Sequence, residues 1–138
     1  MKKLIPFILG LMLVINSFGQ SEAPHKVVMQ VTANDTLVYK ALLNNIFHLK
    51  EGFGDSLKIE VVLHGPAVMM AVANKTKYSD QIKKWSAEGV DFMVCENTMK
   101  KKNITHEEIV PGAKFVPMGL GEIILKEEEG WSYVKIGF

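Results

Sequence analysis

The sequence predicts an α/β fold: a single three-layer domain around a central, mostly parallel sheet of about five strands. Segments rich in β-branched and apolar residues alternate with segments whose apolar residues recur every three or four positions. This order indicates strand–helix–strand units, whose right-handed crossovers give parallel strands covered by helices on both faces. The 138 residues are 48% hydrophobic and 22% charged, which suits one globular domain and excludes a disordered or collagen-like chain.

Residues 1–19 have the features of a cleavable export signal. Two lysines precede an apolar run at 4–15, and the small residues Ser17 and Gly19 suit cleavage before Gln20. An uncleaved membrane anchor is the alternative, but the run is shorter than the roughly 20 residues that a membrane-spanning helix needs. We therefore expect a periplasmic or secreted domain at 20–138, with no stable membrane insertion after cleavage.

Strand and helix segments follow one another through the rest of the chain. Asn34 and Asp35 can cap the first helix, and Gly52 and Gly54 end it. Ser79 can cap a later helix that stops at Gly89. The expected strands are 25–31, 57–63, 90–94, 114–116 and 131–136, and the expected helical segments are 36–51, 67–73, 79–88, 97–102 and 121–129.

The carboxyl ends of parallel strands are the place to look for a functional site. Ligands and chemistry collect there in such sheets, near the point where the strand order reverses. The segments that follow the first four strands are Asn34-Asp35, His64-Gly65-Pro66, Cys95-Glu96-Asn97-Thr98 and Pro117-Met118-Gly119. The only cysteine and a histidine are therefore expected on one edge of the sheet.

Cys95 is the most informative of these residues. It closes the third strand and opens a helical turn, whose amide dipoles favour a thiolate, as nearby lysines also would. Glu96 acts in the opposite direction by placing a carboxylate beside the thiol. The alternative is a buried structural cysteine, because free cysteines are among the most buried residues. A single cysteine excludes an internal disulfide and a multi-cysteine zinc site.

The remaining candidates have weaker support from the sequence. His64 could take a proton from the thiol, and Gly65 would let a ligand approach the backbone closely. A histidine before Gly-Pro can equally bond only its own turn. Asn34 is a candidate ligand-binding residue, with a helix cap as its alternative. Asn97 and Thr98 could donate hydrogen bonds to the sulfur.

Charge and composition narrow the classes of function. All 16 basic residues are lysines, and with 15 acidic residues they give a net charge of +1, so no basic field indicates nucleic acid. Without arginine, bidentate guanidinium clamps on phosphate or carboxylate are unavailable. Thioethers with a thiolate and an imidazole suit Cu(I), but no tract concentrates such ligands. We expect no metal and no cofactor.

Three segments of the chain resemble the DsrE/DsrF-like sulfur-relay family. They are His64-Gly65-Pro66 after its strand, residues 92–99, and the closing stretch 116–133. The resemblance covers nearly the whole mature chain, from residue 25 to 137. It implies a compact α/β domain that is usually assembled as homotrimers or hexamers. It also implies that sulfur is carried as a persulfide on a strand-end cysteine, the position that Cys95 matches.

Two hypotheses for the function follow. The first is an exported sulfur-handling protein in which Cys95, with His64 as base, holds sulfane sulfur or exchanges with a thiol. Its partner would be a sulfur donor or acceptor protein or a small thiol. The alternative is a non-catalytic small-ligand or partner-binding module that uses the same crevice, and redox sensing lies between the two. The apolar stretch 67–73 further predicts burial against copies of the chain, and hence a homo-oligomer.

Overall fold

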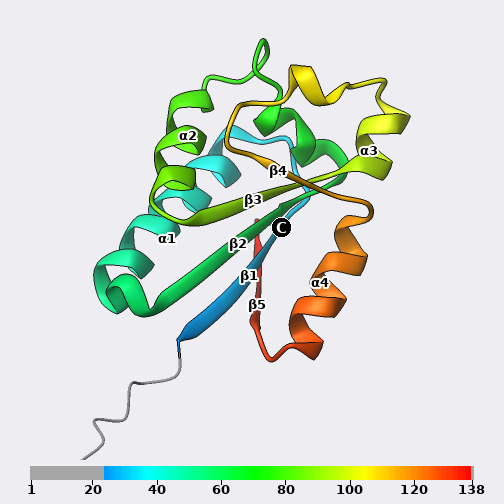
Figure 1. Ribbon diagram of the computed structural model, residues 1–138. Helices are drawn as coiled ribbons and strands as arrows, with labels where there is room; N and C mark the ends of the chain where they lie inside the picture. The colour runs from blue at the N-terminus through cyan, green and yellow to red at the C-terminus, as the bar shows by residue number, and fades with distance from the viewer. Residues whose placement is uncertain (1–23, 138) are drawn as a thin grey trace, which may run out of the picture.

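Five parallel strands form the centre of the structure, a computed structural model that describes residues 24–137 (Figure 1). The predicted export signal lies outside the described residues. The strand order is β4-β3-β2-β1-β5, and every neighbouring pair is parallel. The strands are β1 (His25–Val31), β2 (Leu57–Leu63), β3 (Val90–Cys95), β4 (Lys114–Val116) and β5 (Ser132–Ile136). The expected sheet of about five strands is confirmed, and it is wholly parallel.

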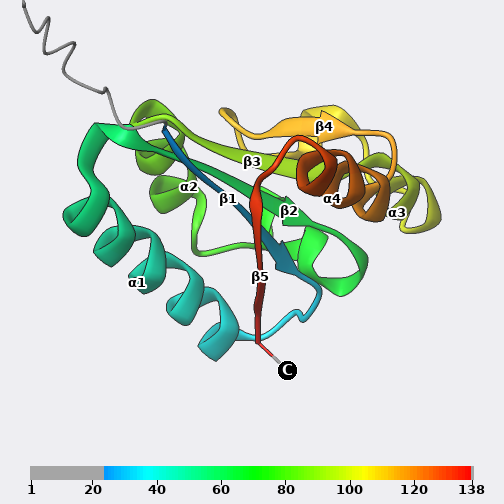
Figure 2. The same ribbon diagram turned by 90° about the horizontal axis from the view of Figure 1, so that it is seen from below.

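Helices cover both faces of the sheet, so the three-layer arrangement is also confirmed. Figure 2 shows α1 (Thr36–Phe53) and α2 (Ser79–Ala87) on one face and α4 (Gly119–Glu128) on the other. The shorter helical segments are α3 (Glu96–Lys101) and the 3-10 helices η1 (Gly54–Ser56), η2 (Gly65–Ala71) and η3 (His106–Glu108). Among the described residues, no helix is long and apolar enough to cross a membrane.

Each face of the sheet has its own hydrophobic core. The larger core lies beneath α1 and α2 and includes Leu42, Phe92 and Met99. The smaller one joins Val28 and Val62 to Ile123 of α4. The central strands contribute to both cores, which explains why their sequences are continuous apolar runs rather than alternating ones.

The two cores show where the chain crosses from one face of the sheet to the other. After β3 the chain enters α3, whose Met99 packs in the larger core. After β4 it enters α4, whose Ile123 packs in the smaller core. Neighbouring strands whose connections leave toward opposite faces open a crevice at their carboxyl ends. Cys95 ends β3 at this edge of the sheet, and Gly119, the first residue of α4, contacts it.

The apolar stretch 67–73 differs from its prediction. Residues 67–71 belong to the 3-10 helix η2, which bonds to distant segments: the Ala67 amide donates to the carbonyl of Thr32, and the Ala71 carbonyl accepts from the amide of Val110. Most of its side chains are buried in the chain's own core. The stretch is therefore not a free surface, and this reason for expecting self-association was wrong.

Two helix starts show how local chemistry sets boundaries. Asp35 caps α1, as predicted, because its Oδ1 accepts the Leu37 amide at 2.7 Å. α4 begins at Gly119, two residues before the predicted start at 121. No side chain caps it, and Met118 occupies the N-cap position. The sequence pattern alone therefore did not mark this start.

Candidate functional site

The sulfur of Cys95 lies where two helices begin. Cys95 is the N-cap residue of α3, and Gly119 is the first residue of α4. The Gly119 amide donates to the Sγ of Cys95 across 3.3 Å. The hydroxyl and amide of Thr98 and the amide of Asn97 complete the set of donors around the sulfur. Helix-start amides carry partial positive charge, so they favour the thiolate over the neutral thiol.

Burial and hydrogen bonding act on this thiol in opposite directions. Burial is the largest single influence and raises the pKa, because Cys95 is only 4% exposed. The hydrogen bonds from Thr98, Gly119 and Asn97 together outweigh burial, and the pKa of Cys95 lies below its ordinary value. The thiolate is thus favoured by hydrogen-bond donors, and not by the lysines that the sequence suggested.

The carboxylate of Glu96 has a partner of its own. Its Oε1 lies 2.9 Å from the Nε2 of His106, and that ring stacks on Phe115 with centroids 3.9 Å apart. Glu96 is not among the groups that shift the pKa of Cys95. The expected opposition from the neighbouring carboxylate is therefore absent, because Glu96 faces His106.

His64 is the cross-strand neighbour of Cys95. The register of β2 and β3 pairs Leu63 with Val94, so the next residue of each strand meets at the carboxyl edge of the sheet. Gly119 supports this placement: a Cβ added there would lie 2.7 Å from the Cβ of His64. The same glycine thus contacts both the imidazole residue and the thiol.

A hydrogen-bonded chain from two other strands holds the imidazole. Tyr133 of β5 donates to the Oε1 of Gln30 on β1, and the Nε2 of Gln30 lies 2.8 Å from the Nε2 of His64. With the amide as donor, the neutral ring carries its proton on Nδ1. Burial lowers the pKa of His64, which also favours the neutral ring. A base role for His64 stays a prediction, and it requires Gln30 to release Nε2.

Thr98 connects the turn after β2 to the thiol. Its Oγ1 accepts the amide of Gly65 at 3.0 Å, and its hydroxyl hydrogen is left to donate to the sulfur of Cys95. Gly65 has a positive φ of 57°, a conformation that glycine adopts without strain. The glycine therefore serves the turn geometry and presents its amide to Thr98.

The structure brings together most of the predicted site residues but separates one. Cys95, His64, Gly65 and Thr98 form one cluster, and Asn97 contributes its amide, which also donates to Pro117 at 3.2 Å. Asn34 lies apart from this cluster. It accepts a hydrogen bond from Tyr39 at 2.9 Å and lines another cavity, which contains none of the other predicted residues.

Sequence reasoning missed three contributors. Gly119 was placed at the correct edge but not recognised as a donor, because its contact depends on where α4 begins. Gln30 and Tyr133 were not noted at all. A signal for Gln30 was present: a lone amide in a buried apolar strand needs a polar partner.

Access to the sulfur is narrow. Cys95 is 4% exposed, and the first turn of α4 contacts it through Gly119. The flanking residues Met118 and Leu120 are 53% and 55% exposed, so this turn lies at the surface. The sulfur is therefore nearly covered and contacts a turn whose neighbouring side chains are exposed. Within residues 24–137, no three His, Cys, Asp or Glu side chains are grouped as metal ligands would be.

Fold and site together define a parallel-sheet α/β protein with a strand-end cysteine at the point where the chain changes faces. Residues 18–136 match the family model of the DsrE/DsrF-like family, and the chain belongs to this family. The predicted resemblance to this family is thereby confirmed. No curated protein shows significant similarity to the chain.

Two solved structures are similar to this one. A protein of unknown function from Methanobacterium thermoautotrophicum matches with a TM-score of 0.77 and 26% identity, over 80% of this chain and 98% of that one. A conserved protein of unknown function from Bacteroides thetaiotaomicron matches with a TM-score of 0.68 and 20% identity, over 84% and 98%. Both likenesses confirm the fold.

Proposed function

We propose that the chain is an exported sulfur-handling protein in which Cys95 carries sulfane sulfur or exchanges with a partner thiol. The observation that carries the proposal is the amide of Gly119, which donates to the Sγ of Cys95 at 3.3 Å. With the donors of Thr98 and Asn97, it lowers the pKa of a buried thiol. A merely structural cysteine in an apolar site has its pKa raised instead. Membership of the DsrE/DsrF-like family supports the same reading.

The proposed transfer needs no cofactor and no external oxidant. The thiolate of Cys95 attacks the outer, sulfane sulfur of a donor persulfide, R–S–SH. A new S–S bond forms at Cys95 while the donor's S–S bond breaks, and the donor leaves as the thiolate R–S⁻. The proton of the persulfide stays on the transferred sulfur, so charge and oxidation state balance. Delivery to an acceptor thiol is the same step in reverse.

The surrounding residues have distinct roles in this proposal. The Gly119 amide and the Thr98 hydroxyl stabilise negative charge on the sulfur of Cys95 before and after transfer. His64, which like Cys95 lies against Gly119, would move a proton once Gln30 releases its Nε2. The lowered pKa of Cys95 favours the attacking thiolate even without that base.

Intact-mass measurement after loading tests the proposal. The purified protein is incubated with a low-molecular-weight persulfide, and the mass is recorded with and without a reducing agent. We expect the addition of one sulfur atom, reversed by reduction, absent in Cys95→Ser and slowed in Thr98→Val. No adduct on the unmodified protein, or an equal adduct on Cys95→Ser, would refute it.

A binding module without chemistry is the second candidate, and the 4% exposure of Cys95 favours it. In that case the crevice binds a small ligand or partner while the cysteine only fills space. The variant Cys95→Ser distinguishes the two functions, because the module predicts unchanged binding and unchanged phenotype, whereas sulfur transfer predicts complete loss.

We further propose that the protein acts outside the cytoplasm and as a homo-oligomer. The leader-like features of residues 1–19 support export, and amino-terminal sequencing of the exported protein should begin at Gln20. Leu120, Ile124 and Leu125 of α4 are each at least 54% exposed, which supports self-association. Light scattering that shows a strict monomer at micromolar concentration would contradict the second part.

A further inference from the structure

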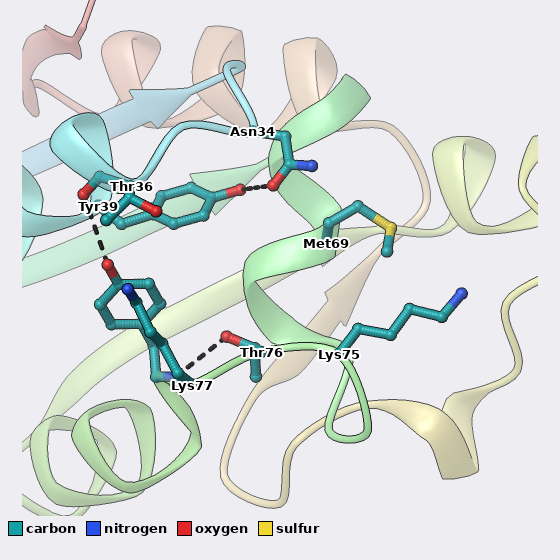
Figure 3. Close-up of a pocket in the computed structure, with 8 residues that line it drawn as sticks. Asn34, Thr36, Tyr39, Met69, Lys75, Thr76 and Lys77 are labelled. Carbon is teal, nitrogen blue, oxygen red and sulfur yellow. Dashed lines mark hydrogen bonds between the residues drawn. The ribbon is translucent and has the colours of Figure 1, made fainter.

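A separate cavity of about 460 Å³ lies on the α1 side of the sheet (Figure 3). Asn34 and Tyr39, from the start of α1, form one wall, and Met69 of η2 with the segment 75–78 forms the other. Its volume falls within the roughly 300–1,000 Å³ of small-molecule sites. None of the residues around Cys95 lines it, so it is a second, independent place to bind something.

The polar groups of this cavity are mostly donors. The Tyr39 hydroxyl donates to the Oδ1 of Asn34 at 2.9 Å, which fixes the amide and leaves its NH₂ group for a ligand. The Tyr78 hydroxyl donates to the carbonyl of Thr36 at 3.4 Å. Burial, with the nearby Tyr78 and Asp35, raises the pKa of Tyr39 to about 12, so its hydroxyl keeps its proton.

The charged side chains that line the cavity are all basic. Lys75 and Lys77 line the cavity, and no Asp or Glu does. Within residues 24–137, neither lysine forms an ion pair with a carboxylate. Lys77 instead lies over the Tyr78 ring, 5.6 Å from its centroid. Asp35, next to Asn34 in the chain, accepts the Leu37 amide as the helix cap.

An apolar surface completes the cavity. The rings of Tyr39 and Tyr78 lie edge-to-face with centroids 5.5 Å apart, and Met69 also lines the cavity. A ligand that fits such a lining has a negatively charged group for the lysines and the Asn34 amide. It also has an apolar part for the sulfur and the rings.

We propose that this cavity binds a small organic anion, with its carboxylate or phosphate group near Asn34 and Lys77 and its apolar part against Met69. The inference goes beyond sulfur transfer at Cys95 and does not depend on it. Carboxylate and phosphate share the chemistry that the lining recognises, so the test compares both.

Protein-detected NMR titration of the full chain provides the test, with benzoate and phenyl phosphate as probes and neutral benzamide as the uncharged control. We expect saturable shifts at the amides of Thr36 and Lys75–Tyr78 with at least one anion, and none with benzamide. The double variant Lys75→Gln, Lys77→Gln should weaken binding by about tenfold or more. The exposed Lys83→Gln, outside the cavity, should leave it unchanged.

Three results would overturn the proposal. They are the absence of saturable shifts with either anion up to about 10 mM, equal binding of benzamide, and equal affinity in the double variant. Thiol reactivity of Cys95 is measured on the same samples, so failure of this inference is distinguishable from failure of sulfur transfer.

Discussion

The amide of Gly119 donates to the sulfur of Cys95 across 3.3 Å, although the two residues are 24 positions apart in the chain. The contact exists because β3 and β4 are adjacent and their connections leave toward opposite faces of the sheet. One helix start follows each strand, and the sulfur lies between the two. The fold itself therefore creates the environment that favours the thiolate.

Removing the Thr98 hydroxyl should make the thiol less reactive. Thr98→Val loses the donor to Sγ and the acceptor for the Gly65 amide, so the pKa of Cys95 should rise. We expect alkylation at neutral pH to slow by roughly three- to tenfold. Thr98→Ser keeps the hydroxyl and serves as the control. Equal rates in all three proteins would show that Thr98 does not act on the sulfur.

A side chain at Gly119 should destabilise the fold and loosen the turn over the thiol. The added Cβ of Gly119→Ala would lie 2.7 Å from the Cβ of His64, so α4 must shift, at a cost of about 1–3 kcal/mol. Urea unfolding measures the cost, and alkylation measures the greater exposure of Cys95. Gly52→Ala is the matched control, since nothing lies within 4 Å of its Cβ position. A free energy of unfolding that is unchanged in Gly119→Ala would contradict the close packing between Gly119 and His64.

The imidazole of His64 should respond to the loss of its amide partner. Gln30→Leu removes the N–H donor at 2.8 Å, which stabilises the neutral ring, so the pKa of His64 should rise. Gln30→Glu should raise it further, because a carboxylate favours the charged ring. NMR titration of the ring protons reports both changes. A pKa that stays the same in both variants would mean that Gln30 does not hold the ring.

Stability should depend on pH through a buried carboxyl group. Glu60 is 1% exposed, with Lys126 Nζ 3.4 Å away, and burial raises the pKa of Glu60 from 4.5 to about 7. The folded state therefore binds the proton more tightly than the unfolded state does. The free energy of unfolding should fall between pH 4.5 and about 7, by on the order of 1–3 kcal/mol.

Urea unfolding at pH 5 and pH 8 measures this dependence. Glu60→Gln should reduce the change in the free energy of unfolding between the two pH values. Glu127→Gln, at an exposed position, is the control and should leave that change as it is. A pH dependence in Glu60→Gln equal to that of the unmodified protein would contradict the assignment to Glu60.

The sequence predicted the fold well because its signals are local. The strand at 57–63 and the helix that Asp35 caps depend on residues within a few positions of each other. The parallel order then follows from general rules of crossover handedness. The 3-10 form of η2 was missed because its end contacts, to Thr32 and Val110, come from distant segments.

The sequence predicted the position of the site and some of the donors around the sulfur. Strand ends placed Cys95 and His64 on one edge without structural data. The donor at Gly119 and the pairing of Glu96 with His106 depend on packing between segments that spacing does not reveal, whereas Thr98 was predicted as a donor because it lies three residues after Cys95. The sequence attributed the thiolate to the amides of the helical turn, to Asn97 and Thr98 as donors, and to nearby lysines. The structure adds the amide of Gly119, and lysines are not among the groups that shift the pKa of Cys95.

The pH dependence of Cys95 alkylation in the folded protein tests the central claim most directly. Iodoacetamide labelling is followed by intact mass from acid to alkaline pH, in parallel with the same chain in denaturant. An activated, reachable thiol reacts in the folded state, and its rate reaches half-maximum at a lower pH than in the unfolded chain. A thiol that reacts only after denaturant is added, or titrates no lower than the unfolded one, would contradict the claim.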